Sequence, residues 1–368
     1  MQPGGLYIHV PFCHAKCFYC DFYSLSATEE LMDAYTDAVV QEWRMRCTEL
    51  PADPVTVYLG GGTPSSIGTQ RLGRILREIP LDTASEITIE ANPEDVTVEW
   101  AREVVAMGVN RVSMGVQSLV DSELRAIGRR HNAVGALAAV AALRAAGVAN
   151  ISLDLIYGLP GQTLKSWQRS LDGVLELRPE HLSAYALAYE EGTRLTSMLR
   201  RGIIKPAADE DVVEMYSRLC TKASEAGYEH YEISNFALPG YRARHNSSYW
   251  SMVPYLGIGP AAHSFDGTDT RRANPGSLRR WLAAIGEGCT ACGIEREDSF
   301  TLTNDRVMTA LRTAEGIPAT SDALRVAAPF LSDGRMTTFT DTHGERRLRI
   351  TESAWIASDP IMAQFMEV

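Results

Sequence analysis

The chain has 368 residues, of which 45% are hydrophobic and 22% are charged, so it can bury one large core or two smaller ones. Its formal net charge of -11 excludes a general nucleic-acid or anionic-membrane binder, because affinity for phosphates requires a basic surface. No apolar run reaches the roughly 18 residues of a membrane span, and Met1–Val10 lacks the basic lead of a signal peptide. Seven cysteines are too few for a secreted disulfide scaffold and indicate a reducing, cytoplasmic location.

The N-terminal two thirds of the chain alternate short apolar runs with longer amphipathic stretches. We predict strands at Leu6–Val10, Val55–Leu59, Glu86–Glu90, Arg111–Val116, Ile151–Tyr157, His181–Leu187 and Tyr228–Ile233. Ser26 and Glu29 form a capping-box pattern after the first run, before an apolar face that repeats at helical spacing to Trp43. This alternation predicts an α/β fold with a parallel sheet, and about six such units fit a full or partial (β/α) barrel.

The alternation stops beyond residue 240, and a Pro/Gly-rich segment runs from Ala237 to Gly276. A helix is predicted over Asn304–Ala314, and two later runs, Arg335–Thr340 and Arg347–Thr351, flank a turn and predict a hairpin. A helix followed by a hairpin suggests a small α+β appendage of winged-helix type. The expected domains are the barrel at 1–236, a connecting segment at 237–296 and the C-terminal domain at 297–368.

Chemically distinctive residues follow the ends of the predicted strands. Cysteines follow the first strand, the glycine-rich Gly60–Pro64 follows the second, and Glu90–Pro93 follows the third. In barrels and open α/β sheets the carboxyl ends of the strands carry the chemistry. The sequence therefore predicts one large cofactor site at that end of the sheet.

Three cysteines, Cys13, Cys17 and Cys20, lie directly after the first strand. Thiolates are soft ligands that hold iron–sulfur clusters, and three of them would leave one iron of a 4Fe-4S cluster open to an exchangeable ligand. The C-x3-C-x2-C spacing favours such a cluster. A zinc site would need a fourth ligand, which His9 or His14 could supply. Unbound thiols are the remaining alternative.

The cysteine spacing, with the aromatic Tyr19 just before the last cysteine, resembles the radical S-adenosylmethionine superfamily. The resemblance implies that S-adenosylmethionine binds the open iron through its amino and carboxylate groups. It also implies that an electron from the cluster cleaves the sulfonium to a 5′-deoxyadenosyl radical. Gly60–Pro64 resembles the family's glycine-rich segment, whose backbone closely approaches the methionine amine.

Three further segments, Tyr7–Cys13, Arg111–Ser118 and Asp154–Thr163, are similar to oxygen-independent coproporphyrinogen III oxidase and its relatives. The likeness covers the chain from about Leu6 to the C-terminus. It implies that one S-adenosylmethionine site is lined by Tyr7, Tyr19, Gly61, Glu90, Ala188 and His263. The positions at which the oxidase contacts a second such molecule are Gly62, Thr63, Gln117, Arg129 and Asp154.

Several of these residues also have purely structural explanations. Glu90 could cap the helix that follows it, and Tyr7 could be an ordinary core residue. Asp154 lies inside an apolar strand, and a buried carboxylate is costly without a partner. Arg129 could be that partner.

Two features depart from the oxidase and resemble the heme-chaperone branch of the family. The oxidase has one more cysteine two positions after the third, where this chain has Phe22, and it has an extension before its first strand. The segment Arg244–Trp250 contains H-N-x-x-Y-W, which resembles a heme-associated motif of that branch. A neutral imidazole such as His245 can ligate heme iron, and Tyr249 and Trp250 offer flat faces to a porphyrin. These side chains could also simply pack the segment down.

The sequence therefore predicts a heme chaperone that carries a 4Fe-4S cluster, S-adenosylmethionine and heme. Heme would lie near His245, with Arg242 or Arg244 pairing with its propionates, and would pass to acceptors that include membrane respiratory enzymes. The resemblance leaves room for a homodimer and for transient membrane contact. The alternative is the oxidase itself, whose radical would attack propionate side chains. Cys289 and Cys292 have redox or metal spacing, which we interpret as incidental.

Overall fold

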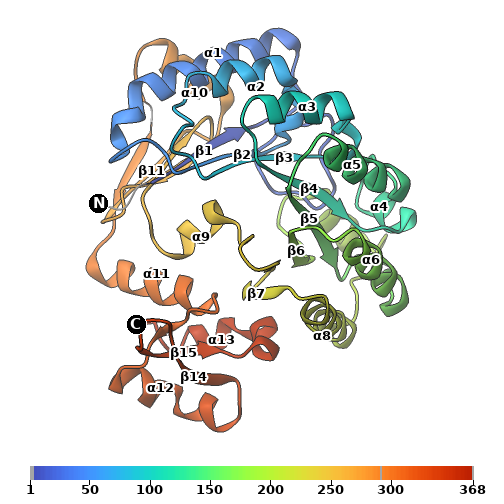
Figure 1. Ribbon diagram of the computed structural model, residues 1–368, viewed down its shortest axis with the longest axis vertical. Helices are drawn as coiled ribbons and strands as arrows, with labels where there is room; N and C mark the ends of the chain where they lie inside the picture. The colour runs from blue at the N-terminus through green and yellow to red at the C-terminus, as the bar shows by residue number, and fades with distance from the viewer. Residues whose placement is uncertain (1–3, 291, 367–368) are drawn as a thin grey trace.

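The computed structural model describes residues 4–290 and 292–366, and its main feature is a curved sheet of twelve strands (Figure 1). Seven neighbouring strands, β9 and β1 to β6, run parallel, and the strands outside them are antiparallel. The two ends of the sheet are β12 and β7, so the barrel is a partial one. The parallel strands after β9 are β1 (Gly5–Val10), β2 (Thr56–Gly61), β3 (Glu86–Ala91), β4 (Arg111–Gln117), β5 (Asn150–Tyr157) and β6 (His181–Ala186). The others are β7 (Glu229–Glu232), β8 (Asn235–Ala237), β9 (Tyr255–Ile258), β10 (His263–Phe265), β11 (Thr270–Ala273) and β12 (Gly293–Arg296).

The parallel α/β fold confirms the prediction from sequence, and each of the seven predicted strands lies within two residues of an observed one. Side chains on these strands alternate between two faces. One face is apolar and packs beneath the helices, as Leu6 and Ile8 do. The other face is polar, and it carries Tyr7, His9 and Asp154. This alternation explains how Asp154 can lie within an otherwise apolar strand.

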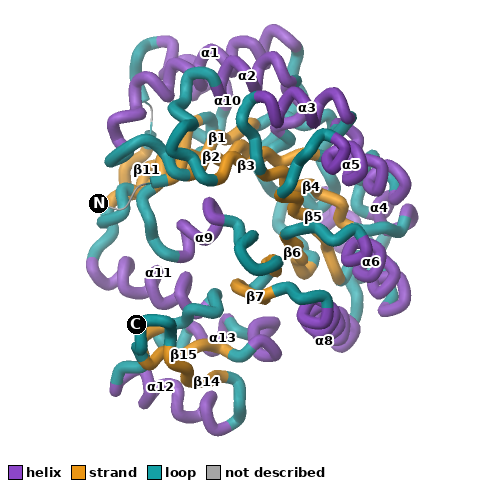
Figure 2. Tube along the Cα trace, viewed as in Figure 1, coloured by secondary structure: helices purple, strands orange, loops and turns teal. Residues whose placement is uncertain are grey.

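The helices cover the outer face of the sheet, while α9 (Arg244–Trp250) lies within its curve (Figures 1 and 2). Glu86, the first residue of β3, holds α9 there, because its carboxylate accepts bonds from the Arg244 and His245 backbone N–H groups at 2.8 and 3.0 Å. The outer helices are α1 (Glu29–Arg46), α2 (Thr69–Leu76), α3 (Val98–Ala106), α5 (Ala133–Ala145), α6 (Leu164–Glu176) and α8 (Asp209–Glu225). Shorter helices are α4 (Asp121–Ala126), α7 (Arg194–Arg200) and α10 (Leu278–Gly286).

The predicted cap of the first helix is wrong by two residues. Thr28, not Ser26, is the N-cap of α1, and its side chain accepts a bond from the Leu31 N–H at 3.4 Å. The Ser26 hydroxyl instead donates to the Cys13 carbonyl at 3.4 Å. Ser26 therefore binds the cysteine segment, and the helix starts where the next hydroxyl can reach its free N–H groups.

The segment at 237–296 extends the main sheet instead of leaving it, because β9 pairs in parallel with β1. Beyond it, α11 (Ser299–Leu311) begins five residues before the predicted helix at Asn304–Ala314, since Asp298 caps it through the Thr301 N–H at 2.8 Å. The predicted hairpin is confirmed. The remaining elements are β13 (Ile317–Pro318), α12 (Ser321–Ser332), β14 (Met336–Thr340), β15 (Arg346–Ile350), η4 (Glu352–Ala357) and α13 (Asp359–Met362). Within the described part of the chain, no helix combines the length and apolarity needed to cross a membrane.

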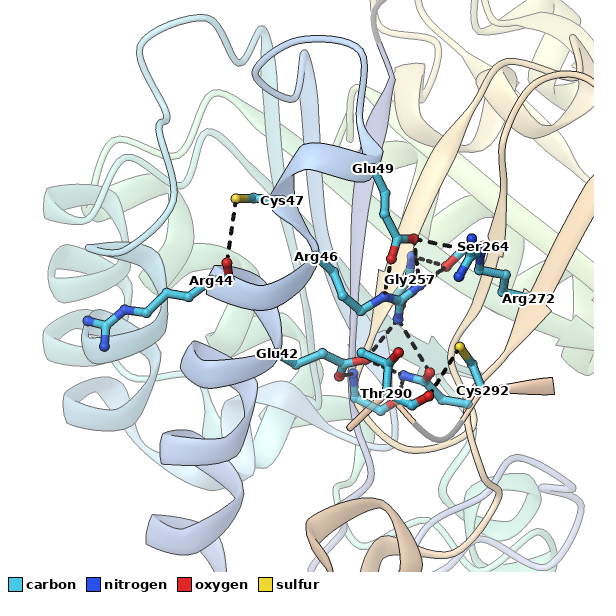
Figure 3. Close-up of polar contacts among 12 residues, drawn as sticks. Glu42, Arg44, Arg46, Cys47, Glu49, Gly257, Ser264, Arg272, Thr290 and Cys292 are labelled. Atoms are coloured by element: carbon cyan, nitrogen blue, oxygen red, sulfur yellow. Dashed lines mark hydrogen bonds and ion pairs between the residues drawn. The ribbon is translucent and has the colours of Figure 1, made fainter. Parts of the chain in front are cut away.

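A buried ion pair ties α1 to the strands that extend the sheet (Figure 3). The Glu42 and Arg46 side chains are each 1% exposed, and Arg46 Nη1 donates to Glu42 Oε1 at 2.8 Å. The Arg46 guanidinium also donates to the Gly257 carbonyl and to the Ser264 hydroxyl, each at 3.1 Å. The pair therefore fixes β9 and β10, and with them His263 at the start of β10.

Candidate functional site at the carboxyl ends of the strands

The three cysteines of the predicted cluster lie together in the loop that follows β1, and all three are free and half-buried. Burial raises the pKa of Cys20 to about 11, and the neighbouring Cys17 and Cys13 thiols add to the shift. Burial also raises the pKa of Cys13. Buried thiols of this kind need a cation or a cationic cluster to hold them as thiolates.

Their spacing suits a multi-iron cluster better than a single ion. Around one zinc ion the thiolate sulfurs lie about 4 Å apart, because each Zn–S bond is about 2.3 Å long. In the described residues these cysteines do not form a group whose ligand atoms lie within 4.8 Å of one another. The proposed fourth zinc ligands are also engaged elsewhere: His14 contacts Asp95 at 3.5 Å, and His9 bonds to Tyr7 and to the Tyr23 carbonyl. A cluster places each thiolate on a different iron atom, so the residues fit it.

A chain of hydrogen bonds joins two of the cysteines. The Cys13 thiol lies 3.3 Å from the Thr63 hydroxyl, which accepts a bond from Asn92 Nδ2 at 3.0 Å. Asn92 Oδ1 in turn accepts a bond from Arg129 Nη2 at 2.7 Å, and Arg129 Nη1 donates to Cys17 Sγ at 3.5 Å. The predicted residues Thr63 and Arg129 thus reach the cysteines directly.

Among the residues of this hydrogen-bond network, Asn92 is the one that we did not predict from the sequence as a site residue. Its position in the sequence, two residues after Glu90 in the loop that follows β3, could have indicated that it belongs to the site. The suggested structural pairing of Arg129 with Asp154 does not hold, because Arg129 Nη2 donates to Asn92 and, at 2.5 Å, to the Gly115 carbonyl. Arg129 is therefore a positioning residue at the cysteines.

The glycine-rich segment packs too tightly for side chains. Gly61 has a φ of 106°, and a Cβ atom there would lie 2.5 Å from the His9 ring. A Cβ atom on Gly62 would lie 2.7 Å from the Val10 and Phe12 carbonyl oxygens. Close backbone approach at both positions leaves no room for a Cβ atom, so only glycine fits there, while the Gly61 and Gly62 N–H groups bond to Glu90 and to the Val10 carbonyl.

Glu90 lies at the end of β3 and bonds across to β2. Its Oε1 accepts a bond from the Tyr58 hydroxyl at 2.7 Å, and its Oε2 accepts one from the Gly61 N–H at 3.1 Å. These contacts exclude the structural explanation that Glu90 caps the following helix. Burial raises the pKa of Glu90 to about 7. A buried carboxylate at a strand end is suited to accept bonds from ligand hydroxyl or amino groups.

Two further predicted residues, Asp154 and Gln117, are held in energetically unfavourable states. Burial raises the pKa of Asp154 to about 6, although Ser113 donates a bond to it at 3.4 Å. Gln117 has a φ of 64°, a left-handed conformation that non-glycine residues rarely adopt, at an irregularity in the β4–β5 pairing. Strain of this kind gathers at functional sites. The other predicted positions near the strand ends are Tyr19, which packs against the small cluster of Ile127, Ile156 and Leu159, and Ala188, which lies exposed just beyond β6.

A cavity of about 710 Å³ adjoins this site and extends towards the C-terminal domain. Two predicted cofactor residues, Tyr7 and His263, form part of its wall, so Tyr7 is not simply a core residue. Phe22 lines the same cavity from the cysteine loop, and Tyr249 and Trp250 line it from α9. Phe22 and the two aromatic residues of the H-N-x-x-Y-W motif thus meet in one place.

His245 does not line this cavity. It is fully buried, with Nδ1 2.8 Å from the Thr56 hydroxyl and Nε2 2.7 Å from the Tyr249 hydroxyl. Burial lowers the pKa of His245 to about 3, so the ring is neutral. Tyr249 therefore stands between the imidazole and the cavity. Trp250 also borders a second cavity of about 590 Å³, whose wall includes Arg242, Arg244 and Arg347.

The family model of the Radical SAM superfamily matches residues 7–173. The protein named heme chaperone HemW from Mycobacterium tuberculosis is 34% identical, over 98% of this chain and 94% of its own. The HemW protein of Bacillus subtilis is 38% identical over 76% of each chain. The chain belongs to the HemW family of radical SAM proteins. Among solved structures, the coproporphyrinogen III oxidase HemN of Escherichia coli matches with a TM-score of 0.82, covering 99% of this chain and 90% of its own at 22% identity.

Membership of the HemW family accounts for the cysteines, the glycine-rich segment and the fold together. The superfamily model spans the cysteine loop and β1 to β5, which carry most of the predicted site. The likeness to HemN extends over the C-terminal domain as well and concerns the fold alone. Family membership therefore implies a 4Fe-4S cluster and S-adenosylmethionine, and the contacts described above suit both.

The buried imidazole of His245 leads to a prediction about acid stability. Its folded-state pKa of about 3 lies below the ordinary value of 6.5, so acid protonates it in the unfolded chain first. The contribution of the neutral His245 ring to the free energy of unfolding is complete above pH 6.5. It falls by about 1.4 kcal/mol per pH unit as the pH drops towards 3. Glu90 and Asp154, whose pKa values are raised, act in the opposite sense.

The test is the difference in free energy of unfolding between the wild type and His245→Gln, in which those carboxyl contributions cancel. We expect this difference to shrink as the pH is lowered from about 6 to 4, by about 1.4 kcal/mol per unit. Urea unfolding at several pH values measures it. A difference that stays constant with pH would contradict a neutral, buried His245.

Proposed function

We propose that this protein is a heme chaperone, which binds heme in the 710 Å³ cavity and delivers it to heme-requiring acceptor proteins. The observation that carries the proposal is the meeting of Phe22, Tyr249 and Trp250 in that cavity. Phe22 is 63% exposed, although large apolar side chains are usually covered. A porphyrin face would cover it and stack on the other two rings. Relatives named heme chaperone HemW match this chain along nearly its whole length.

We further propose His245 as the ligand of the heme iron. Its neutral ring is already in the state that binds iron, because the low pKa keeps it unprotonated. Its Nε2 is held by the Tyr249 hydroxyl at 2.7 Å, so ligation requires Tyr249 to turn away from the ring. Arg244 borders the second cavity beside Trp250 and could pair with a heme propionate, whereas Arg242 in the same wall would first have to leave Glu229 and Glu315.

The cluster and S-adenosylmethionine belong to the same proposal. When bound, they supply a one-electron reductant and a source of the deoxyadenosyl radical. Cys13, Cys17 and Cys20 would hold the cluster, with Thr63 and Arg129 fixing two of the thiolates. Gly61, Glu90 and His263 would contact S-adenosylmethionine. Acceptors such as respiratory enzymes suit a carrier that works in a reducing compartment and touches the membrane only transiently.

A heme titration of the purified chain, followed by the Soret band, tests the cavity. Trp250→Ala should weaken heme binding at least about tenfold, because a buried ring stacked on a porphyrin contributes more than about 1.4 kcal/mol. Phe300→Ala is the matched control, since Phe300 is 40% exposed and lies on α11 away from the lining of both cavities. Equal affinity of Trp250→Ala and the wild type would reject the cavity as the heme site.

The iron ligand is tested in the same titration. His245→Ala should abolish the Soret shift, whereas Tyr249→Phe, which frees Nε2, should retain it. His343→Ala in the exposed turn of the β14–β15 hairpin is the control. An unchanged shift in His245→Ala would remove His245 as the ligand.

Incubation of the cluster-loaded protein with coproporphyrinogen III, S-adenosylmethionine and a reductant distinguishes the oxidase, because sustained protoporphyrinogen formation would reject the chaperone assignment.

A further inference from the structure

A second group of metal-ligating side chains lies far from the cysteine loop in sequence, where the C-terminal domain meets the barrel. It consists of Cys220 on α8, His230 on β7 and Glu352 at the start of η4. One ligand atom from each lies within 4.8 Å of those of the other two. Cys220 Sγ is 3.9 Å from His230 Nδ1, which is 2.7 Å from Glu352 Oε1.

The three side chains are held in place by their surroundings. The His230 ring stacks on Phe236 at 3.9 Å between centroids, and Trp355 of η4 meets it edge-on at 4.5 Å. The Tyr216 hydroxyl donates to the Glu352 carbonyl at 2.9 Å and so fixes the start of η4 against α8. The thiol and imidazole are therefore positioned before any ligand arrives.

Burial gives the group a closed side and an open side. Cys220 is 8% exposed and the His230 side chain is 6% exposed, while the Glu352 side chain is 46% exposed. His230 Nε2 is buried without a hydrogen-bond partner, so no hydrogen bond from the protein holds that nitrogen of the ring. An ion from solvent could enter past the carboxylate and reach the two deeper ligands.

We propose that Cys220, His230 and Glu352 bind one divalent ion of the zinc type, with water as the fourth ligand. A thiolate, an imidazole and a carboxylate form a mixed soft and intermediate donor set, which selects zinc over magnesium or calcium. In a tetrahedral site the sulfur–nitrogen and nitrogen–oxygen separations are roughly 3.6 and 3.3 Å. The observed 3.9 and 2.7 Å require changes of about 0.3 and about 0.6 Å, the larger of which the half-exposed Glu352 can supply.

Ion binding at this site releases one proton. A cysteine binds a divalent ion only as the thiolate, so the Cys220 thiol gives up its proton to solvent when the ion binds. The proton on the imidazole moves to Nε2, which leaves Nδ1 free for the ion. The balance is thus one M²⁺ bound and one H⁺ released to solvent.

The ion would join the barrel to the C-terminal domain. Cys220 and His230 belong to the barrel side, and Glu352 belongs to the segment that follows β15. Both cavities are walled by these two parts together: Met308 and Thr309 of α11 complete the first, and Arg347 of β15 borders the second. The ion would therefore fix the distance between the two walls.

Cobalt(II) titration of the cluster-loaded full chain tests the site, because Co²⁺ bound to a thiolate gives a charge-transfer band. All samples carry Cys289→Ser and Cys292→Ser to remove a second pair of cysteines that could bind Co²⁺. We expect one equivalent of Co²⁺ with this band, displaced by Zn²⁺, and a dependence of the binding enthalpy on buffer that reports one released proton. Loss of the band in Cys220→Ser, but not in the control Cys47→Ser, assigns it to this thiol.

A second variant guards against misfolding. Glu352→Gln changes a half-exposed side chain, so the fold should persist while Co²⁺ affinity falls by more than the roughly 10–100-fold that loss of an outer-shell partner costs. Zn²⁺ should also raise the Tm of the wild type and not that of Cys220→Ser. The same Co²⁺ spectrum and affinity in the wild type and in Cys220→Ser, or the absence of any thiolate band in the wild type, would overturn the proposal.

Discussion

Replacement of Cys17 by alanine should abolish binding of the 4Fe-4S cluster. The cluster would keep two thiolates, and the iron that Cys17 holds would lose its only protein ligand. Anaerobic reconstitution followed by iron and sulfide analysis and Mössbauer spectroscopy measures the result. We expect about four irons in the wild type, by the stoichiometry of the family cofactor, and almost none in the variant.

Cys47→Ala is the matched control, because Cys47 is also half-buried but lies at the end of α1, away from the loop. It should retain the full cluster. Arg129→Lys is a milder variant, since it keeps the charge near Cys17 but loses the forked contacts to Asn92 and the Gly115 carbonyl. Full cluster content in Cys17→Ala, or zinc in place of iron in the wild type, would contradict the assignment.

Replacement of Glu42 by glutamine should destabilise the fold by about 3 kcal/mol, because the buried Arg46 charge then keeps only the 30% exposed Glu49, at 3.0 Å, as its counter-charge. The Glu42 carboxylate also accepts bonds from the Gly259 N–H, from Asn274 Nδ2 and from Trp281 Nε1, at 2.7–2.8 Å. A glutamine side chain has only one acceptor oxygen, and its NH₂ group cannot accept the bonds that these N–H groups donate. Urea unfolding measures the loss.

The control for this prediction is Glu78→Gln. Glu78 pairs with Arg44 at 2.7 Å on the surface, where both side chains are at least a third exposed, and exposed pairs contribute less than about 1 kcal/mol. A similar small loss in both variants would show that the Glu42–Arg46 pair is not desolvated. Because the pair fixes β9 and β10, Glu42→Gln should also loosen His263 and weaken S-adenosylmethionine binding.

Local chemistry allowed the sequence alone to determine much of this protein. The strands are evident because a strand buried under helices needs apolar side chains at every second position, as Leu6 and Ile8 provide. The cysteine motif is evident because the three ligands lie on one short loop. The glycine-rich segment follows the same logic, since Gly61 adopts a backbone conformation that strongly favours glycine.

Only the tertiary structure decided which distant residues meet. Asn92 joins Thr63 to Arg129, and the group of Cys220, His230 and Glu352 forms where three separate elements pack. The motif suggested His245 as a heme ligand, and only the structure shows that α9 turns its ring inward to Thr56 and Tyr249. Such partners are fixed by side-chain packing across the sheet and between domains, and that packing has no fixed spacing along the chain.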